Sequence, residues 1–152
     1  MVMESTLNRF VLMTPAFHPN RDFLTLEKLF LIGTGGFIGA VMRYLVGNAT
    51  QSWGKSQNFP LGTLIVNLIG CLAIGFLSHV GENSRVITPE ARSFLFIGIL
   101  GAFTTFSTFS NETVNLFREG QGFYSALNVA AHIFIGLAAV WVGRQAALMI
   151  WR

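Results

Sequence analysis

Four long stretches with almost no charged residues, separated by short polar connections, dominate the sequence. They cover about residues 29–46, 61–80, 93–117 and 123–142. A bilayer core about 30 Å thick needs about 20 mostly apolar residues per helix, and each stretch is close to that length. The pattern therefore predicts an all-α membrane protein with four transmembrane helices.

The connections are short and rich in residues that favour turns: GNATQSWGKSQNFP, GENSRVITPE and REGQG. Pro60 and Pro89 stand just before the second and third helices, where a missing N–H is tolerated. No connection has room for a soluble domain, so residues 28–152 are predicted to form one membrane domain. Residues 1–27 are polar and lack the basic start, apolar core and cleavage site of a signal peptide, so we expect a cytoplasmic tail.

The basic residues give only a weak signal for orientation. With four spans, the N-terminus, the middle connection and the C-terminus share one side of the membrane. That side carries Arg9, Arg21, Lys28, Arg85, Arg92, Arg144 and Arg152, and the other side carries Arg43, Lys55 and Arg118. Without the two arginines of the tail the bias toward a cytoplasmic N-terminus is slight.

Composition excludes several classes of function. Only 11% of the residues are charged and 52% are hydrophobic, which fits lipid rather than water as the main solvent. The basic residues never form a run, which argues against nucleic-acid binding. The single Cys71 lies in an apolar stretch and is expected to be a small buried hydrophobe. No nucleotide, metal-ligand or catalytic motif is present, so the chain is not predicted to be an enzyme.

The glycines of the first span favour helix packing. Gly35 and Gly39 are spaced as in a small-xxx-small seam, and this explanation is preferred to a phosphate-binding loop because the segment is apolar. The histidines His18, His79 and His132 are isolated, which is more typical of hydrogen-bonded structural groups than of ligands. Of the three, His132, near the start of the fourth span, is the strongest candidate for a functional role.

Polar residues at membrane depth are costly unless they are satisfied, so each is a functional candidate. Asn67 lies near the middle of the second span, with Thr63 one turn earlier on the same face. The Asn67 amide either forms an interhelical hydrogen bond or offers N–H donors to an anion. The third span adds hydroxyls and an amide, many of which could bond back to the helix: Thr104, Thr105, Ser107, Thr108, Ser110 and Asn111.

The third span also contains phenylalanines and potential helix breakers in the run GILGAFTTFSTFSNE. Phe106 and Phe109 fall on one side of a helix, and spacing alone favours packing, although ring edges are partly positive and could face an anion. Gly98, Gly101 and the Thr104–Thr105 pair could interrupt the helix. Carbonyl groups freed there could coordinate a cation such as Na⁺.

Together, the segments GGFIGAVMRY, GTLIVNLIG and GAFTTFSTFSNE, in this order on the first three spans, resemble the Fluc/CrcB family of fluoride channels. The resemblance covers about residues 30–150. It implies a homodimer whose subunits insert in opposite orientations, with two fluoride pores along the interface. A heterodimer with a paralogous partner of fixed orientation stays open.

The resemblance also implies roles for individual residues. The phenylalanine edges would contact the dehydrated anion, the Asn67 amide would line the pore, and Arg43 would lie at a vestibule or helix end. The fluoride-pore set is Phe106, Phe109, Asn67, Thr63, Ser107 and Glu112, with Glu112 near a pore mouth. Gly101 and Thr104 would give backbone carbonyls to one structural Na⁺ at the dimer centre. The family often has a polar track of Tyr and Ser on the fourth span, where this chain has Asn128, His132 and Gly136.

The expected function is passive, fluoride-selective export across the inner membrane of a prokaryote, which reduces fluoride toxicity. HF enters a cell as a neutral molecule and dissociates inside, and the membrane potential then favours exit of the anion. One alternative is a small multidrug-type antiporter, which would require a carboxylate at mid-membrane. The other is a non-transporting assembly subunit that uses the glycine seams only for packing.

Overall fold

A computed structural model describes residues 25–53, 59–83 and 87–150, so most of the expected tail lies outside the described residues. In the described part, four helical stretches are long and apolar enough to cross a membrane. These are Leu26–Trp53, Leu61–Glu82, Pro89–Arg118 and Gly122–Ile150. The predicted all-α architecture with four helices capable of spanning a membrane is thereby confirmed, and the first and fourth helices continue well past residues 46 and 142.

The first two spans are each one α-helix and the last two are composite. The first is α2 (Leu26–Trp53) and the second is α3 (Leu61–Asn83). The third consists of α4 (Pro89–Arg92), the π-helical segment η2 (Ser93–Leu100), α5 (Gly101–Phe103) and α6 (Phe106–Arg118). The fourth consists of α7 (Gly122–Ala130), the π-helical segment η3 (Ala131–Ile135) and α8 (Gly136–Ile150).

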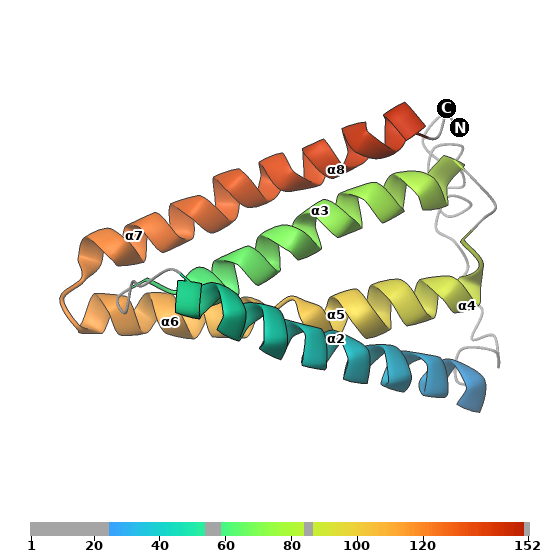
Figure 1. Ribbon diagram of the computed structural model, residues 1–152, viewed down its shortest axis with the longest axis horizontal. Coiled ribbons are helices and arrows are strands. Elements are labelled where there is room, and N and C mark those ends of the chain that lie inside the picture. Colours follow the sequence, from blue (N-terminus) through green and yellow to red (C-terminus); the bar gives the residue numbers. More distant parts are fainter. Residues whose placement is uncertain (1–24, 54–58, 84–86, 151–152) are drawn as a thin grey trace, which may run out of the picture.

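Local sequence explains where the third span begins and ends. Thr88 has extended backbone and its hydroxyl accepts a hydrogen bond from the Ala91 amide at 3.2 Å, while Pro89 occupies the first turn. At the other end Gly120 adopts a φ of 76°, the left-handed conformation that favours glycine after a helix. The short turn that follows leads directly into α7, so α6 and α7 lie side by side (Figure 1).

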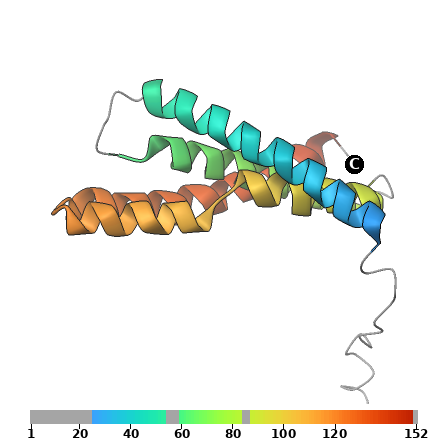
Figure 2. The same ribbon diagram turned by 90° about the horizontal axis from the view of Figure 1, so that it is seen from below.

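Two residues separate α5 from α6. Thr104 (φ −84°, ψ 155°) and Thr105 (φ −151°, ψ 115°) have extended backbone, and the link is visible in Figures 1 and 2. The two parts of the third span then have different neighbours, because η2 and α5 pack against α2 while α6 packs against α7. Thr104 and Thr105 therefore lie where the packing partner of the third span changes from α2 to α7.

Glycines allow the closest approaches between helices. A Cβ atom added at Gly39 would collide with the Ile99 carbonyl oxygen of η2, and one added at Gly75 would collide with the Val140 carbonyl oxygen of α8. Such close approach of backbones is typical of helix seams in membranes. The packing explanation is thereby confirmed for Gly35 and Gly39 of the first span, and α3 is held against α8 in the same way.

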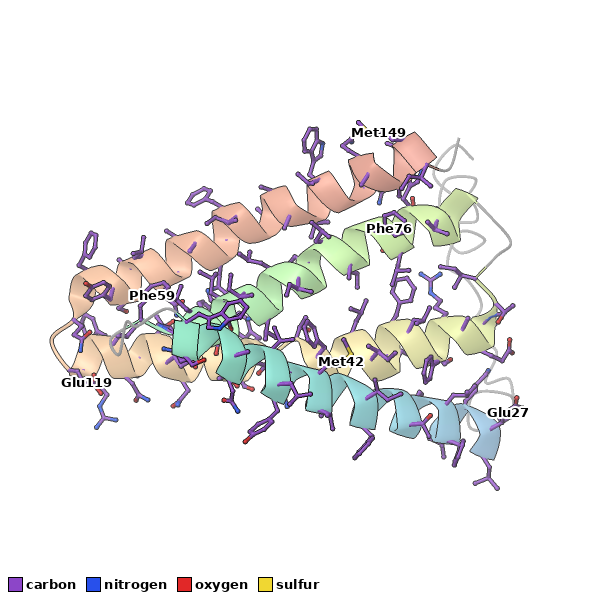
Figure 3. All side chains as sticks on the ribbon, in the orientation of Figure 1. Glu27, Met42, Phe59, Phe76, Glu119 and Met149 are labelled. Carbon is purple, nitrogen blue, oxygen red and sulfur yellow. The ribbon has the colours of Figure 1, made fainter. Side chains whose placement is uncertain are left out.

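The outward faces of the helices are apolar. Phe30, Phe37 and Phe134 are each more than 70% exposed, and Figure 3 shows Met149 on the side of α8 that faces away from α3. Large apolar side chains exposed in this number would be a liability in water, whereas lipid is their natural surrounding.

Candidate functional site

A polar cavity of about 600 Å³ opens between α2, α3 and α6. Thr63 and Glu112 face each other in it, and the Thr63 hydroxyl donates to Glu112 Oε1 at 2.7 Å. The second carboxylate oxygen, Oε2, is buried without a hydrogen-bond partner. Arg43 lies in the wall of the same cavity. The cavity thus brings together Thr63, expected in the pore, Glu112, expected near a pore mouth, and Arg43, expected at a vestibule or helix end.

A second cavity, an apolar groove of about 770 Å³, shares Thr105 with the first. Phe106 and Phe109 both line it, with ring centroids 5.4 Å apart and ring planes tilted by 55°. Phe106 is 80% exposed, so it is not packed into the core of the single chain. Asn67, Gly101 and Thr104 line the same groove.

Thr105 lines both cavities, and its backbone is hydrogen-bonded to Asn67, which lines the apolar groove. Asn67 Nδ2 donates to the Thr105 carbonyl oxygen at 3.2 Å, and Asn67 Oδ1 accepts from the Thr105 amide at 2.9 Å. The interhelical hydrogen bond considered for Asn67 is therefore present, and it uses one of the two N–H donors of the amide. Thr105 lines both cavities, so the extended pair forms part of the wall between them.

The carbonyl groups of Gly101 and Thr104 are deprived of their usual helical partners. In a continuous helix the Thr105 amide would bond Gly101, but it donates to Asn67 instead. The Thr108 amide would bond Thr104, but it donates to the Thr105 hydroxyl at 3.2 Å. Both residues line the groove, and freed carbonyls of an interrupted membrane helix are suitable ligands for Na⁺. The donor set therefore fits the ion that the family implies.

Most hydroxyls of the third span bond to nearby groups. Thr104 donates to the Leu100 carbonyl oxygen at 3.0 Å and Ser110 donates to that of Phe106 at 2.9 Å, which confirms the expected back-bonding. Ser107 is exposed and its hydroxyl lies 3.2 Å from that of Thr105. Ser107 is not among the described residues that line the two cavities, but its hydroxyl contacts Thr105, which lines both, so its pore role stays a prediction.

Sequence analysis did not foresee a set of contacts that supports Phe109. Asn128, fully buried in α7, donates from Nδ2 to the Thr113 hydroxyl at 2.9 Å. Thr113 in turn donates to the Phe109 carbonyl oxygen at 2.7 Å. The His132 ring stacks on the Phe109 ring at a centroid distance of 4.2 Å. The signals in the sequence that could have pointed to these contacts were Asn128 and His132, two polar residues on a mostly apolar span.

The comparison with known proteins shows the family to which the chain belongs. Residues 30–144 match the family described as "CrcB-like protein, Camphor Resistance (CrcB)". The chain is 43% identical over 125 residues to the protein named fluoride-specific ion channel FluC of Elusimicrobium minutum (strain Pei191), covering 82% of this chain and 97% of that protein. It is 40% identical over 129 residues to the protein of the same name from Clostridium novyi (strain NT), covering 83% of this chain and 100% of that protein. A further relative of that name, from Shewanella sp. (strain ANA-3), is 44% identical over 121 residues, covering 79% of this chain and 95% of that protein. The chain therefore belongs to the CrcB family.

Proposed function

We propose that the protein is a fluoride-selective channel. Its relatives of 40 to 44% identity are named fluoride-specific ion channels, and they are matched over nearly their whole length. The observation that carries the proposal for this chain is the succession of two cavities that meet at Thr105. A polar cavity with Thr63 and Glu112 leads to an apolar groove lined by Phe106 and Phe109.

The groove has the chemistry that a small, dehydrated anion requires. Phenylalanine edges carry partial positive potential, so successive edges can stabilise fluoride without trapping it on a fixed charge. The remaining N–H of the Asn67 amide is a neutral donor at the entrance to the rings. Selectivity over chloride then comes from the narrowness and weak polarity of the path rather than from net charge.

The complete pore needs a second copy of the chain in the antiparallel orientation. The groove holds the pore phenylalanines on an open face, with Phe106 80% exposed, and a second copy would close it. The weak bias of basic residues is compatible with insertion in both orientations. A paralogous partner of fixed orientation is the alternative, and it predicts that this chain alone does not form a conducting dimer.

One structural Na⁺ at the dimer centre would be held by the carbonyl oxygens of Gly101 and Thr104. The support is the diversion of the Thr105 and Thr108 amides, which removes the normal helical bonds of these carbonyls. When bound, the ion would supply positive charge that compensates the exposed carbonyls at the interface. The chain's own contribution is the extended geometry of residues 104 and 105, which Asn67 fixes.

The proposed role is passive export across the inner membrane, which lowers fluoride in the cytoplasm. A potential of 100 mV favours anion exit by about 2.3 kcal/mol per charge, so a pore needs no further energy source. A multidrug-type antiporter would need a carboxylate at mid-membrane. Among the described residues that line the groove there is no Asp or Glu.

Fluoride efflux from liposomes tests the proposal. Purified dimeric protein should release trapped fluoride faster than empty liposomes do, and Phe106→Ile and Phe109→Ile should each slow efflux about tenfold, which corresponds to about 1.4 kcal/mol. Phe117→Ile is the matched control, because Phe117 is 71% exposed on the same helix and is not among the residues of either cavity. An assembly subunit would show changed stability in the two pore variants but no fluoride efflux in any of the proteins.

A further inference from the structure

The ring of His132 packs directly against the ring of Phe109. The two rings have centroids 4.2 Å apart and planes inclined by 38°. His132 lies in the π-helical segment η3 (Ala131–Ile135), and short π-helical segments inside α-helices are frequent at functional sites. Both residues line the apolar groove.

Three hydrogen bonds and one ring contact link Phe109, Thr113, Asn128 and His132 in a closed loop between the third and fourth spans. The Thr113 hydroxyl donates to the Phe109 carbonyl oxygen, and Asn128 Nδ2 donates to the Thr113 hydroxyl, at 2.7 and 2.9 Å. The Asn128 backbone carbonyl then lies 2.9 Å from His132 Nδ1, and the His132 ring returns to Phe109. The backbone and the ring of Phe109 are thus both held by the fourth span.

The hydrogen bond to Asn128 determines which nitrogen of the neutral His132 imidazole carries the proton. Because a carbonyl oxygen only accepts hydrogen bonds, Nδ1 of His132 carries the hydrogen that reaches the Asn128 carbonyl. Nε2 is then a bare acceptor, and it is buried without a hydrogen-bond partner. A second proton would make the ring a cation while leaving the bond from Nδ1 intact.

Few titratable groups face this ring from the elements around it. Cys71 of α3 lines the same groove, whereas the Tyr124 ring of α7 packs near Phe59 instead. From α8, Arg144 forms a salt bridge with Glu82 of α3. No Asp, Glu, Lys or Arg is found among the described residues that line the groove.

The nearest carboxylate on α6, the helix that carries Phe109, is Glu112. It lies in the polar cavity and accepts a hydrogen bond from Thr63. Glu112 could add its own pH dependence to conduction, so any test must separate the two groups.

We propose that His132 is a positioning residue for the pore ring of Phe109, and that protonation of His132 strengthens fluoride binding at that ring. The inference rests on the proposed function. A cation on the negative face of a phenylalanine ring is attracted to it and draws electron density from it. The ring edge, which meets the anion, then becomes more positive.

The test is the fluoride current in planar bilayers, measured between about pH 8 and about pH 5, the range in which imidazole ordinarily titrates. Current is the suitable readout because neutral HF crosses lipid without carrying charge. The fluoride concentration for half-maximal wild-type current should fall about three- to tenfold toward low pH, as expected for a cation–π contact.

Two variants distinguish the effect of the His132 charge from the effect of its aromatic ring. His132→Phe keeps an aromatic face and removes titration, so it should conduct and lose this part of the pH dependence. His132→Ala removes the face and should conduct less at every pH. Glu112 is present in all of these proteins, so the difference between the wild-type and His132→Phe pH profiles can be assigned to His132.

His79→Gln is the matched control, because His79 is also buried but is not among the residues that line the groove. Its pH profile should follow that of the wild type.

Each remaining outcome has a defined meaning. Identical pH profiles for wild type and His132→Phe, or an unchanged current in His132→Ala, would overturn this proposal alone. Absence of fluoride current at every pH would overturn the proposed function as well.

A second measurement uses the wild-type protein alone. Because the coupling between fluoride binding and protonation is reciprocal, fluoride should move the titration of the His132 ring, followed by NMR, toward higher pH. A titration unaffected by fluoride would contradict the proposal.

Discussion

The side-chain amide of Asn67 on α3 forms hydrogen bonds with both backbone groups of Thr105, the N-cap residue of α6 in the third span. Nδ2 donates to the Thr105 carbonyl oxygen at 3.2 Å and Oδ1 accepts from the Thr105 amide at 2.9 Å. One side chain therefore satisfies both backbone groups of a residue that has left the helix. In a membrane this matters more than in water, because no solvent can take over the bonds.

Replacing Asn67 by Leu should destabilise the folded dimer. The substitution leaves the N–H of Thr105 without a partner, which costs about 1 to 3 kcal/mol, and removes the second hydrogen bond to the Thr105 carbonyl oxygen. Thermal unfolding in detergent should show the loss, and fluoride efflux should fall because the wall between the cavities is no longer fixed. Asn111→Ala, at an exposed amide on α6, is the control and should unfold like the wild type. Equal unfolding of Asn67→Leu and wild type would contradict the assigned role of the amide.

The seam between α2 and η2 predicts opposite effects for two glycines of one helix. Gly39→Ala places a methyl group against the Ile99 carbonyl oxygen, and overpacking of this kind costs about 1 to 3 kcal/mol. At Gly33 an added Cβ meets no atom within 4 Å, so Gly33→Ala should be neutral or stabilise the helix by up to about 1 kcal/mol. Thermal unfolding of both variants in the same detergent checks the contrast. If Gly39→Ala is as stable as Gly33→Ala, the close contact between Gly39 of α2 and Ile99 of η2 is wrong.

The hydrogen bond between Thr63 and Glu112 predicts an effect on conduction. The Thr63 hydroxyl holds Glu112 Oε1 at 2.7 Å, and a hydrogen bond to a charged group is worth about 1.5 to 3 kcal/mol. Thr63→Val keeps the shape and removes the donor, so the carboxylate is no longer held in place and can move further into the polar cavity, where its charge repels anions. Fluoride current should fall severalfold in Thr63→Val and be retained in Thr63→Ser, which keeps the hydroxyl. Equal currents in the two variants would show that the bond has no part in permeation.

Sodium should stabilise the dimer if the carbonyls of Gly101 and Thr104 hold it. An ion that binds only the folded protein at 100 times its dissociation constant adds about 2.7 kcal/mol to stability. The unfolding temperature should therefore rise with sodium concentration and stay constant in choline chloride of equal ionic strength. The same unfolding temperature in both salts would remove the support for a sodium site.

The sequence was sufficient for those features that depend on one helix at a time. Absence of charge over about 20 residues predicts a span, and the spacing of Gly35 and Gly39 predicted a packing seam that the close approach to η2 confirms. Back-bonding of Thr104 and Ser110 was likewise predictable, because both partners lie within one turn.

Contacts between helices could not be derived in this way, because they depend on the relative register of the spans. Asn67 could be predicted to form an interhelical bond, but not that its partner would be the backbone of Thr105. The pair of Asn128 and Thr113 was missed for the same reason. Ser107 shares α6 with Phe106 and Phe109, yet it is not among the described residues that line either cavity, because positions one and two residues apart on a helix point in different directions.

The central claim is that this chain forms a pore selective for fluoride, and competing efflux of two anions tests it most directly. Liposomes loaded with equal concentrations of fluoride and chloride, and containing wild-type protein shown to be folded and dimeric, should release fluoride at least about a hundredfold faster than chloride, a difference of about 2.7 kcal/mol. Fluoride release no faster than from empty liposomes, or release of chloride at the same rate as fluoride, would contradict the account.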